Sequence, residues 1–599
     1  MPTAEPAARA AAERAERGSG GGRGRRWVWA GLAVVLLGGL GLRLWGVGQG
    51  LPYVYNVDEA EHFVPHAVAM FAQGTLNPRY FENPPALTYL LHFLFYLSYG
   101  SAHGVERTFA LHPGAVYTLA RVAVSVLGTA ALWLLYLTGA RLFNRAAGLL
   151  AAAIEAVAFL PVFYGHLALN DAPTLAPLTL SLLGTAGVLR KGRLRDYLLA
   201  GVGLGLACAS KYTAGIVILP LAAAAAVQFL ERGQAGPGRV LAGSALALLA
   251  ALAAFLIANP YALLDYSSFH AELVHQSTLS AEAQGKLGAP KEGGLAYYAW
   301  SLTWGLGWAP ALAALGGALA IWRSHRRVGW LLVPASVLFL AFMSLEGRYF
   351  GRWLLPIFPV LCLLAAFFAV RLMEWASALA ARGPAPRVLS ACAGALVVAA
   401  LLAQGLLYSI HSGAVLSRAD TRGLTRQWML ANVPEGAKIV AEPVSPSQWA
   451  QERPGATDCP GYRWCKYPSL FPRISASGAL LPRALPEVSI ENYVRTLAPA
   501  LLGYYERNGY CWVISGSTQS DRAFADPGAV PLAIAYYRAL ERRGEVVYRA
   551  SPYARGQGPA AFGFDWSFDY YPLAYDRPGP AMTVYRLHGG RCGQRPGLS

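Results

Sequence analysis

The sequence predicts an α-helical membrane protein with about eleven transmembrane helices and a small extracytoplasmic α/β domain at its C-terminal end. Composition is the first reason. Hydrophobic residues make up 55% of the 599 residues and charged residues only 14%, whereas soluble proteins carry charge on about a quarter of their residues. Pattern is the second reason: the apolar residues gather in runs of about 20, the length of a bilayer-spanning helix, and these runs end before residue 411.

The first predicted span, 27–47, follows the basic residues Arg23, Arg25 and Arg26. A signal peptide is the alternative, but further spans follow and no small-residue cleavage site is evident. We therefore expect a transmembrane helix, preceded by a disordered cytoplasmic tail over residues 1–26. The other predicted spans of this transmembrane domain, 27–410, are 115–140, 146–168, 172–189, 197–210, 213–230, 239–259, 296–321, 328–345, 352–373 and 388–410.

Basic residues between the spans predict the orientation in the plasma membrane. Lys and Arg concentrate in cytoplasmic loops, and a cytoplasmic N-terminus places every basic cluster there, provided that the apolar segment 84–100 lies in the outer interface without crossing. This orientation explains the net charge of +17. No basic stripe points to nucleic acid. The clusters are Arg141 and Arg145; Arg190, Lys191, Arg193 and Arg195; Arg232 and Arg239; Arg323, Arg326 and Arg327; and Arg382 and Arg387.

Residues 411–599 differ in composition and are predicted to form an extracytoplasmic α/β domain. Four short segments have strand patterns: Lys438–Glu442, Cys511–Ser515, Glu545–Tyr548 and Met582–Leu587. The domain holds an even number of cysteines in a compartment where disulfides persist, which favours two disulfides of open pairing over a zinc site. These cysteines are Cys459, Cys465, Cys511 and Cys592.

Acidic residues are predicted on the outer side of the membrane. Asp58 and Glu59 follow the first span, within an outer loop over 48–114, at the start of an amphipathic helix expected over Asp58–Gln73. Taken alone, this acidic pair needs no functional explanation, because acidic residues are favoured at the N-terminus of any helix. Asp171 lies at the outer end of another span, where an acid is costly unless it is paired or functional.

Basic residues are predicted on the same side: Arg121, Lys211 and Arg348 all lie at outer span ends. A carboxylate can act as a general base, and cations at the membrane boundary can hold a phosphate and stabilise it as a leaving group. Together the two clusters predict a catalytic site. The outer loop 260–295 offers a lid or a metal ligand, although a solvated loop is the simpler interpretation. Glu155 lies within a span and has no evident partner.

The order of several short motifs resembles the GT-C glycosyltransferases of the protein O-mannosyltransferase and lipid A aminoarabinose transferase type (glycosyltransferase family 39-like). These motifs are Asp58-Glu59-Ala60, Pro84-Pro85-Ala86-Leu87, Asp171, Lys211-Tyr212-Thr213 and Arg348-Tyr349. The resemblance covers about the first two-thirds of the chain and implies an inverting transfer from a polyprenyl-phosphate sugar donor.

The resemblance also implies roles for particular residues. Asp58 matches the family's key aspartate, with Glu59 beside it, and Asp171 matches a second acid. Lys211 and Arg348, with Tyr212, Tyr349 and Arg121 near them, resemble the contacts to the donor. Glu82 and His275 resemble positions that bind zinc. One acid and one histidine are too few to establish a metal site, so a divalent metal is possible and no cofactor is assigned. Asn83 stands where the aminoarabinose transferase has a phosphate-binding lysine.

The sequence therefore predicts a membrane glycosyltransferase that acts on an extracytoplasmic acceptor, whether protein, lipid or glycan. A polytopic transporter or lipid flippase is the alternative, which inverted repeats and charges at the bilayer midplane would favour. A non-catalytic membrane scaffold is a third class. The sugar, the acceptor, the length of the lipid and the oligomeric state are left open.

Overall fold

A computed structural model provides the fold of the chain. It describes residues 26–231, 236–281, 287–381, 385–450, 463–467, 471–475, 477–485, 492–564 and 570–593. Residues 1–25 of the predicted tail 1–26 lie outside the described residues, and Arg26 begins the first helix. Arg232, Arg382 and Cys459 also lie outside the described residues.

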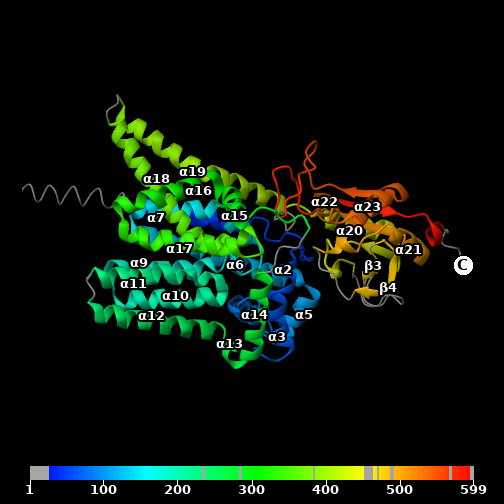
Figure 1. The fold of residues 1–599 in the computed structure, drawn as a ribbon, viewed down its shortest axis with the longest axis horizontal. Coiled ribbons are helices and arrows are strands. Elements are labelled where there is room, and N and C mark those ends of the chain that lie inside the picture. The colour runs from blue at the N-terminus through cyan, green and yellow to red at the C-terminus, as the bar shows by residue number, and fades with distance from the viewer. Residues whose placement is uncertain are drawn as a thin grey trace, which may run out of the picture.

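A bundle of long, nearly parallel helices forms the larger part of the molecule, and the C-terminal domain lies against one end of it (Figure 1). We call this the domain-facing end. After the first helix, Arg26–Leu44, the bundle contains α6 Pro113–Leu142, α7 Arg145–Val157, α8 Phe159–Phe163, α9 Leu175–Lys191, α10 Leu194–Ser210, α11 Ile218–Leu230, α12 Pro237–Ala258, α15 Gly294–Leu302, α16 Trp308–Ser324, α17 Arg326–Leu345, α18 Phe358–Ala380 and α19 Pro386–Leu416.

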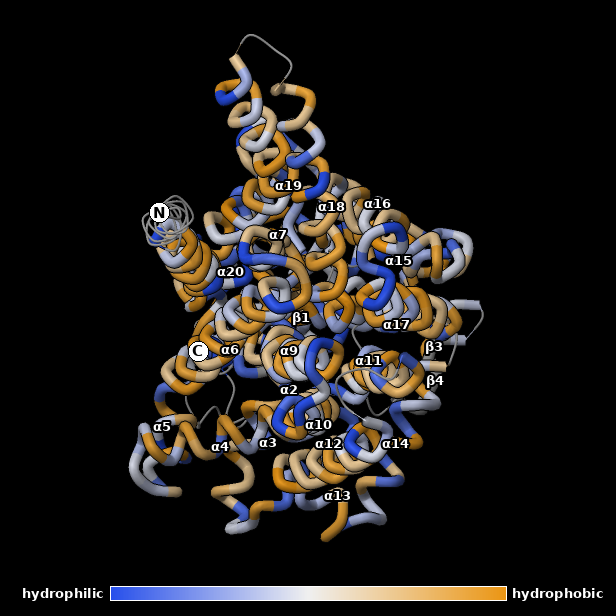
Figure 2. The backbone as a smooth tube through the Cα atoms, turned by 90° about the vertical axis from the view of Figure 1, so that its left-hand side faces the viewer, coloured by the Kyte–Doolittle hydropathy of each residue, from blue (hydrophilic) through white to orange (hydrophobic). Residues whose placement is uncertain are grey.

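Helix length and hydropathy identify the spans. Eight helical stretches among the described residues are long and apolar enough to cross a membrane, or nine if α7 and α8 form one bent span. Helices α9 and α10, at 17 residues each, also run from one end of the bundle to the other. With them, every predicted span corresponds to a helix of the bundle. Viewed from the opposite end, the helices are largely hydrophobic, and hydrophilic turns face the viewer (Figure 2). The prediction of a helical membrane protein is confirmed.

Glycines allow α10 to pack closely against its neighbours. A Cβ atom at Gly201 or Gly205 would collide with backbone oxygens of α12, and one at Gly203 would collide with the backbone of α9. Small residues four apart are the usual means by which membrane helices approach each other. This packing fixes the position of α10, which ends at the predicted site residue Lys211.

Several membrane helices are irregular near the domain-facing end. The predicted span 146–168 is broken, since α7 and α8 meet at a bend of 62°. Short helical turns η1 Tyr164–His166, η2 Tyr212–Val217 and η4 Gly351–Ile357 and a π-helical turn, η3 Thr303–Gly307, lie on other segments. Irregular backbone at membrane depth is tolerated where protein or a cavity satisfies it, so we expect neighbouring protein groups to satisfy the backbone at these breaks.

The first outer loop folds into short helices at the domain-facing end: α2 Val57–Glu61, α3 Phe63–Ala72, α4 Ala86–Tyr99 and α5 Ala102–Leu111. The predicted continuous helix over Asp58–Gln73 is wrong, because the chain breaks at His62 between α2 and α3. Helix α4 has 14 residues, about 21 Å at 1.5 Å per residue, which is too short to cross a bilayer core of about 30 Å.

Most of the first part of the outer segment 260–295, up to Ala281, is helical where a solvated loop was expected. It forms α13 Tyr261–Leu264 and α14 Tyr266–Ala281, and α14 lies beside the outer-loop helices (Figure 1). Asn77 donates to the Asp265 carboxylate over 2.8 Å, and Glu272 accepts from the backbone N–H groups of Phe81 and Glu82. Acidic residues of this segment therefore hold the outer loop in place.

The C-terminal domain is built on a five-stranded mixed sheet of order β2-β1-β5-β7-β6. Strands β1 and β5 are parallel, and β7 runs antiparallel to β5 and β6. The four predicted strands are present as β1, β5, β6 and β7, whereas β2 and the β3–β4 hairpin were not predicted. The elements are α20 Thr421–Asn432, β1 Lys438–Ala441, β2 Cys465–Tyr467, β3 Phe471–Ile474, β4 Leu480–Leu485, α21 Ala500–Asn508, β5 Trp512–Gly516, α22 Ser517–Ala525, α23 Pro531–Arg543, β6 Glu545–Ala550 and β7 Met582–Arg586.

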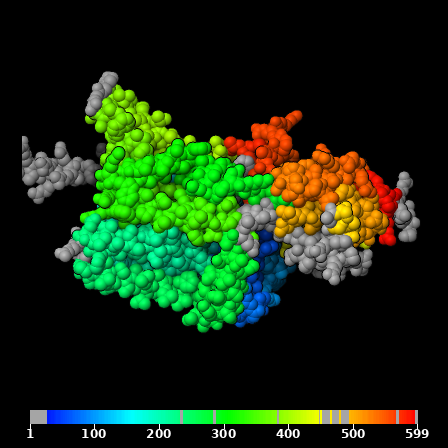
Figure 3. Space-filling view, in the orientation of Figure 1, coloured from blue at the N-terminus to red at the C-terminus, as the bar shows by residue number. Residues whose placement is uncertain are grey.

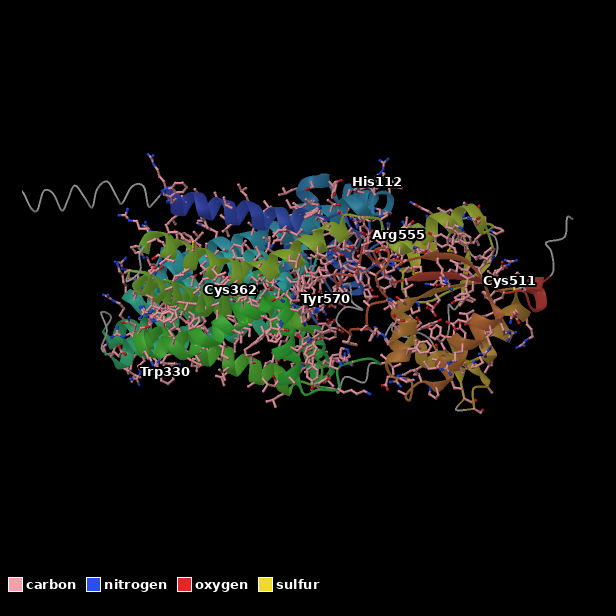
Figure 4. The ribbon with its side chains drawn as sticks, turned by 90° about the horizontal axis from the view of Figure 1, so that it is seen from above. His112, Trp330, Cys362, Cys511, Arg555 and Tyr570 are labelled. Carbon is pink, nitrogen blue, oxygen red and sulfur yellow. A yellow bond between two sulfur atoms is a disulfide. The ribbon has the colours of Figure 1, made fainter. Side chains whose placement is uncertain are left out.

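Cysteines support this domain. Cys511 and Cys592 form a disulfide across 81 residues of sequence, at the end of the domain far from the bundle (Figure 4). Cys465 is also disulfide-bonded. Cys208, Cys362 and Cys392, all in membrane helices, are free.

Candidate functional site

Asp58 lies on the first turn of α2, at the domain-facing end of the bundle. Asn56 caps this helix, and its side chain accepts from the Glu59 backbone N–H over 3.0 Å. Consecutive residues on a helix point to different sides, and the two acids separate accordingly. The Asp58 side chain is 33% exposed and that of Glu59 is 0% exposed.

Arg352 is the direct partner of Asp58. Its guanidinium lies 2.5 Å from the Asp58 carboxylate, and the His62 imidazole lies 3.7 Å from the other carboxylate oxygen. Burial raises the pKa of Asp58, but Arg352 and His62 together outweigh burial and hold that pKa well below its usual range. Asp58 is therefore ionised near neutral pH, and part of its side chain remains exposed to solvent.

Asp171 and Lys211 form a second ion pair close to the first. The Lys211 ammonium donates to the Asp171 carboxylate, and both side chains are largely buried. Asn170 donates to the Ser210 carbonyl over 2.7 Å, which joins the turn before α9 to the end of α10. Arg352 interacts electrostatically with Asp171 as well as with Asp58, so the two pairs lie near each other.

Glu59 and Arg121 form a closed pair inside the protein. Two parallel hydrogen bonds of 2.7 and 2.8 Å join the guanidinium to the carboxylate. Arg121 also donates to the carbonyls of Val47 and Gln49, and Glu59 accepts from the Ala168 N–H. The pair ties the turn after the first helix, α2, α6 and the segment before Asp171 together, and its side chains are 0–1% exposed.

Tyr212 and Glu82 lie where the outer loop meets α14. The Tyr212 hydroxyl donates to the Phe81 carbonyl over 2.9 Å. The Glu82 carboxylate lies 3.6 Å from the His275 imidazole, which is itself largely exposed. No group of three or more His, Cys, Asp or Glu side chains suited to a metal occurs among the described residues. Glu82 and His275 are brought together as a pair.

Arg348 and Tyr349 lie in the connection between α17 and η4. The Tyr349 ring packs against those of Tyr297 and Tyr298, at centroid distances of 5.5 and 6.1 Å. The predicted arginine of this connection was Arg348, but the arginine on Asp58 is Arg352, four residues later. Sequence reasoning missed it because it assigned Arg352 to the apolar span, although a second arginine at a span boundary was a signal.

A chain of polar side chains extends from Asp58 into the outer loop. The Tyr80 hydroxyl is 2.9 Å from His62 Nδ1, and Asn83 donates to that hydroxyl over 2.6 Å. The Tyr80 ring lies between the imidazoles of His62 and His66, at 5.2 and 4.5 Å. His62 thus contacts both Asp58 and Tyr80, and sequence reasoning did not single it out.

The site therefore combines a partly exposed carboxylate, a second carboxylate and two cations, at the end of a membrane bundle and beneath a folded domain. Such an arrangement can take a proton from an acceptor and bind an anionic group.

Residues 107–262 match the family model described as dolichyl-phosphate-mannose-protein mannosyltransferase. This segment includes Arg121, Asp171 and Lys211. None of the curated proteins matches the chain in sequence.

Solved structures resemble the fold over most of its length. The archaeal oligosaccharyltransferase AglB from Archaeoglobus fulgidus, in complex with an inhibitory peptide and a dolichol-phosphate, has a TM-score of 0.51 and 13% identity, covering 90% of this chain and 75% of that one. The chain is thus an integral membrane protein with the GT-C fold, as predicted. ArnT from Cupriavidus metallidurans, bound to undecaprenyl phosphate, has a TM-score of 0.44 and 13% identity, covering 95% and 99%.

Proposed function

We propose that the protein is a membrane glycosyltransferase that moves a sugar from a polyprenyl-phosphate donor to an extracytoplasmic acceptor, with inversion at the anomeric carbon. The observation that carries this proposal is the meeting of the Asp58–Arg352 and Asp171–Lys211 pairs at one site. Membrane proteins place ionisable groups together at this depth for function.

Asp58 is the proposed general base. Of the three predicted acids it alone is substantially exposed. It accepts the proton of an acceptor hydroxyl or amine while the acceptor atom bonds to the anomeric carbon. The bond from that carbon to the lipid phosphate oxygen breaks, and its electron pair leaves with the phosphate.

Arg352 and Lys211 are the proposed partners of the leaving phosphate. Each now neutralises a carboxylate, and a donor phosphate would compete for both cations. Drawing Arg352 towards the phosphate would raise the basicity of Asp58, so donor binding would prepare the base. Arg348, in the same connection, remains a candidate for a further phosphate contact.

Glu59 and Arg121 are proposed as positioning residues. Every oxygen of Glu59 is engaged by Arg121 or by a backbone N–H, so it has no geometry for proton transfer to a substrate. Asp171 is proposed to hold Lys211 in place until the donor binds.

The class of donor rests on two similarities. The family model that matches residues 107–262 is described by a dolichyl-phosphate sugar, and the AglB structure of the same fold holds a dolichol-phosphate. The side of the membrane rests on charge: the exposed residues Arg190, Lys191, Arg193 and Arg195 lie at the end of the bundle away from the C-terminal domain, which places that end in the cytoplasm.

The test is the release of polyprenyl phosphate from a panel of polyprenyl-phosphate sugars by the purified protein in detergent. We expect Asp58→Asn to lower the rate by about 100-fold or more and to remain folded. Glu231→Gln is the matched control, because Glu231 is a similarly exposed acid, 44%, paired with Arg327 at the opposite end of the bundle.

Turnover by Asp58→Asn at the control's rate would defeat the assignment of the base. Movement of an intact lipid-sugar across vesicles, without release of lipid phosphate, would instead show a flippase.

A further inference from the structure

The segment 570–576 belongs to the C-terminal domain in sequence but packs in the membrane bundle. Tyr570 is 2% exposed and lies in the hydrophobic core of the bundle. Figure 4 shows it at the junction of the helices and the sheet, and Figure 3 shows the orange-red segment after β6 reaching from the domain towards the bundle. Two contacts hold the segment: His411 of α19 lies 3.0 Å from the Pro572 carbonyl, and Arg418, just after α19, pairs with Asp576.

Tyr570 occupies an aromatic socket at the irregular parts of the membrane helices. Its ring lies 4.9–6.0 Å from those of Phe159, Phe163, Tyr164 and Trp304. Phe159 and Phe163 are on α8, just after the 62° bend, and Trp304 is on the π-helical turn η3. A side chain of the C-terminal domain thus packs against the membrane helices at the positions where their backbone is irregular.

The hydroxyl of Tyr570 connects the socket to the candidate site. It lies 2.6 Å from the hydroxyl of Tyr164, and the Arg352 guanidinium lies 5.9 Å from the centre of the Tyr164 ring. Arg352 interacts electrostatically with both tyrosines. The Arg352 guanidinium that contacts Asp58 therefore also lies near a hydrogen-bonded tyrosine pair, of which one member comes from the C-terminal domain.

We infer that Tyr570 is a positioning residue of the transferase site, which acts through Tyr164 to hold Arg352 against Asp58. The C-terminal domain then completes the catalytic geometry, beyond any part in binding an acceptor. This inference rests on the proposed function, because it takes Arg352 and Asp58 as the reacting site.

Tyr570→Phe tests the inference, because it removes the hydroxyl and keeps the ring in its socket. We expect kcat for lipid-phosphate release to fall about 3- to 10-fold, the worth of one hydrogen bond, with the donor KM changed less than twofold. Because Asp58 would lose part of its Arg352 contact, the acid limb of kcat/KM should move to higher pH. The groups around Asp58 that would remain are His62 and, through His62, Tyr80.

Two further variants separate positioning from packing. Tyr553→Phe is the control, because Tyr553 precedes the same segment and its ring packs on Tyr575. The double variant Tyr164→Phe/Tyr570→Phe should be no slower than the slower single variant, since both remove the same hydrogen bond. Effects that multiply, or a Tyr570→Phe enzyme equal to the control, would overturn the inference.

Amide hydrogen exchange over residues 351–357 provides a readout that needs no turnover. In Tyr570→Phe these amides should exchange faster than in Tyr553→Phe, and equal rates would overturn the inference. If the unaltered protein releases no lipid phosphate from any donor while exchange still responds to Tyr570→Phe, the proposed function fails and the positioning of the η4 segment by Tyr570 stands.

Discussion

At the scale of single residues, the site depends on which cation each carboxylate contacts. Asp58 contacts Arg352, Asp171 contacts Lys211 and Glu59 contacts Arg121. Arg352 interacts electrostatically with the carboxylates of the first two pairs, which retain some exposure, whereas the third pair is closed. On this difference in accessibility we propose chemistry for the first two pairs and a structural role for the third.

Arg352→Gln should move the activity that depends on the proposed base to higher pH. Burial raises the pKa of Asp58, and Arg352 is the largest influence that lowers it, so the pKa of Asp58 should rise in Arg352→Gln. A general base works only when deprotonated, so activity at low pH should be lost. The measurement is kcat/KM for lipid-phosphate release against pH, which reports the free enzyme.

Arg371→Gln is the control for Arg352→Gln, since Arg371 forms an exposed pair with Glu374. An acid limb at the same pH in Arg352→Gln and in the control would contradict the contact with Asp58.

Glu59→Gln should affect folding more than chemistry. Removing one partner of a buried ion pair costs about 3–5 kcal/mol, because the other charge is left uncompensated. We expect a lower thermal midpoint in detergent and nearly unchanged turnover per folded molecule. The double variant Glu59→Leu/Arg121→Met should be more stable than Glu59→Gln. If Glu59→Gln kept full stability but lost turnover, Glu59 would have a catalytic role instead of a structural one.

At the scale of secondary-structure elements, close helix packing sets the position of the cations. Helix α10 is pressed against α12 at Gly201 and Gly205 and against α9 at Gly203, and Lys211 follows directly at its end. The bend between α7 and α8 and the turn before α9 likewise bring Asp171 next to Lys211.

Gly205→Leu should separate α10 from α12 and so displace Lys211. A side chain at Gly205 would collide with the α12 backbone, and overpacking typically costs about 1–3 kcal/mol. We expect a lower thermal midpoint and weaker binding of inorganic-phosphate or polyprenyl-phosphate probes. Gly41→Leu is the control, because a Cβ atom there meets nothing within 4 Å. Equal midpoints for the two variants would contradict the packing argument.

At the scale of the whole molecule, the two ends of the bundle differ in their polar residues and in whether the C-terminal domain covers them. Hydrophilic turns lie at the opposite end (Figure 2), and the C-terminal domain covers the end that holds the ion pairs (Figure 1). Contacts between Arg422 and the Tyr55 ring at 3.8 Å, and between Arg426 and the Tyr53 ring at 5.2 Å, attach the domain to the first outer loop.

The proposed orientation predicts which cysteines a membrane-impermeant maleimide reaches in intact cells. In a background without Cys208, Cys362 and Cys392, Arg555→Cys should be labelled and Arg193→Cys should not. Both arginines are exposed. Arg555 lies near the junction of the bundle and the C-terminal domain (Figure 4), whereas Arg193 lies in the turn between α9 and α10, at the other end of the bundle. After the cells are opened, both should be labelled. Labelling of Arg193→Cys in intact cells would place the basic turns outside and overturn the orientation.

The sequence by itself determined the fold class and most of the elements. Long apolar runs predict membrane helices because a bilayer accepts little else, and alternating patterns identified β1, β5, β6 and β7. The motif order Asp58, Asp171 and Lys211 pointed to the GT-C fold, which the comparison confirms. Each of these inferences uses local composition or the spacing of residues, and both can be read from the sequence without knowledge of the tertiary structure.

Only the tertiary structure decided which charges meet. Arg352 and Arg348 are equally basic in the sequence, yet Arg352 contacts Asp58, and Glu59 is buried against Arg121 although it is adjacent to the exposed Asp58. Tyr570 reaches Tyr164 across 406 residues of sequence. Such contacts depend on helix bends and on domain docking, which arise from packing among distant segments, so no local pattern encodes them.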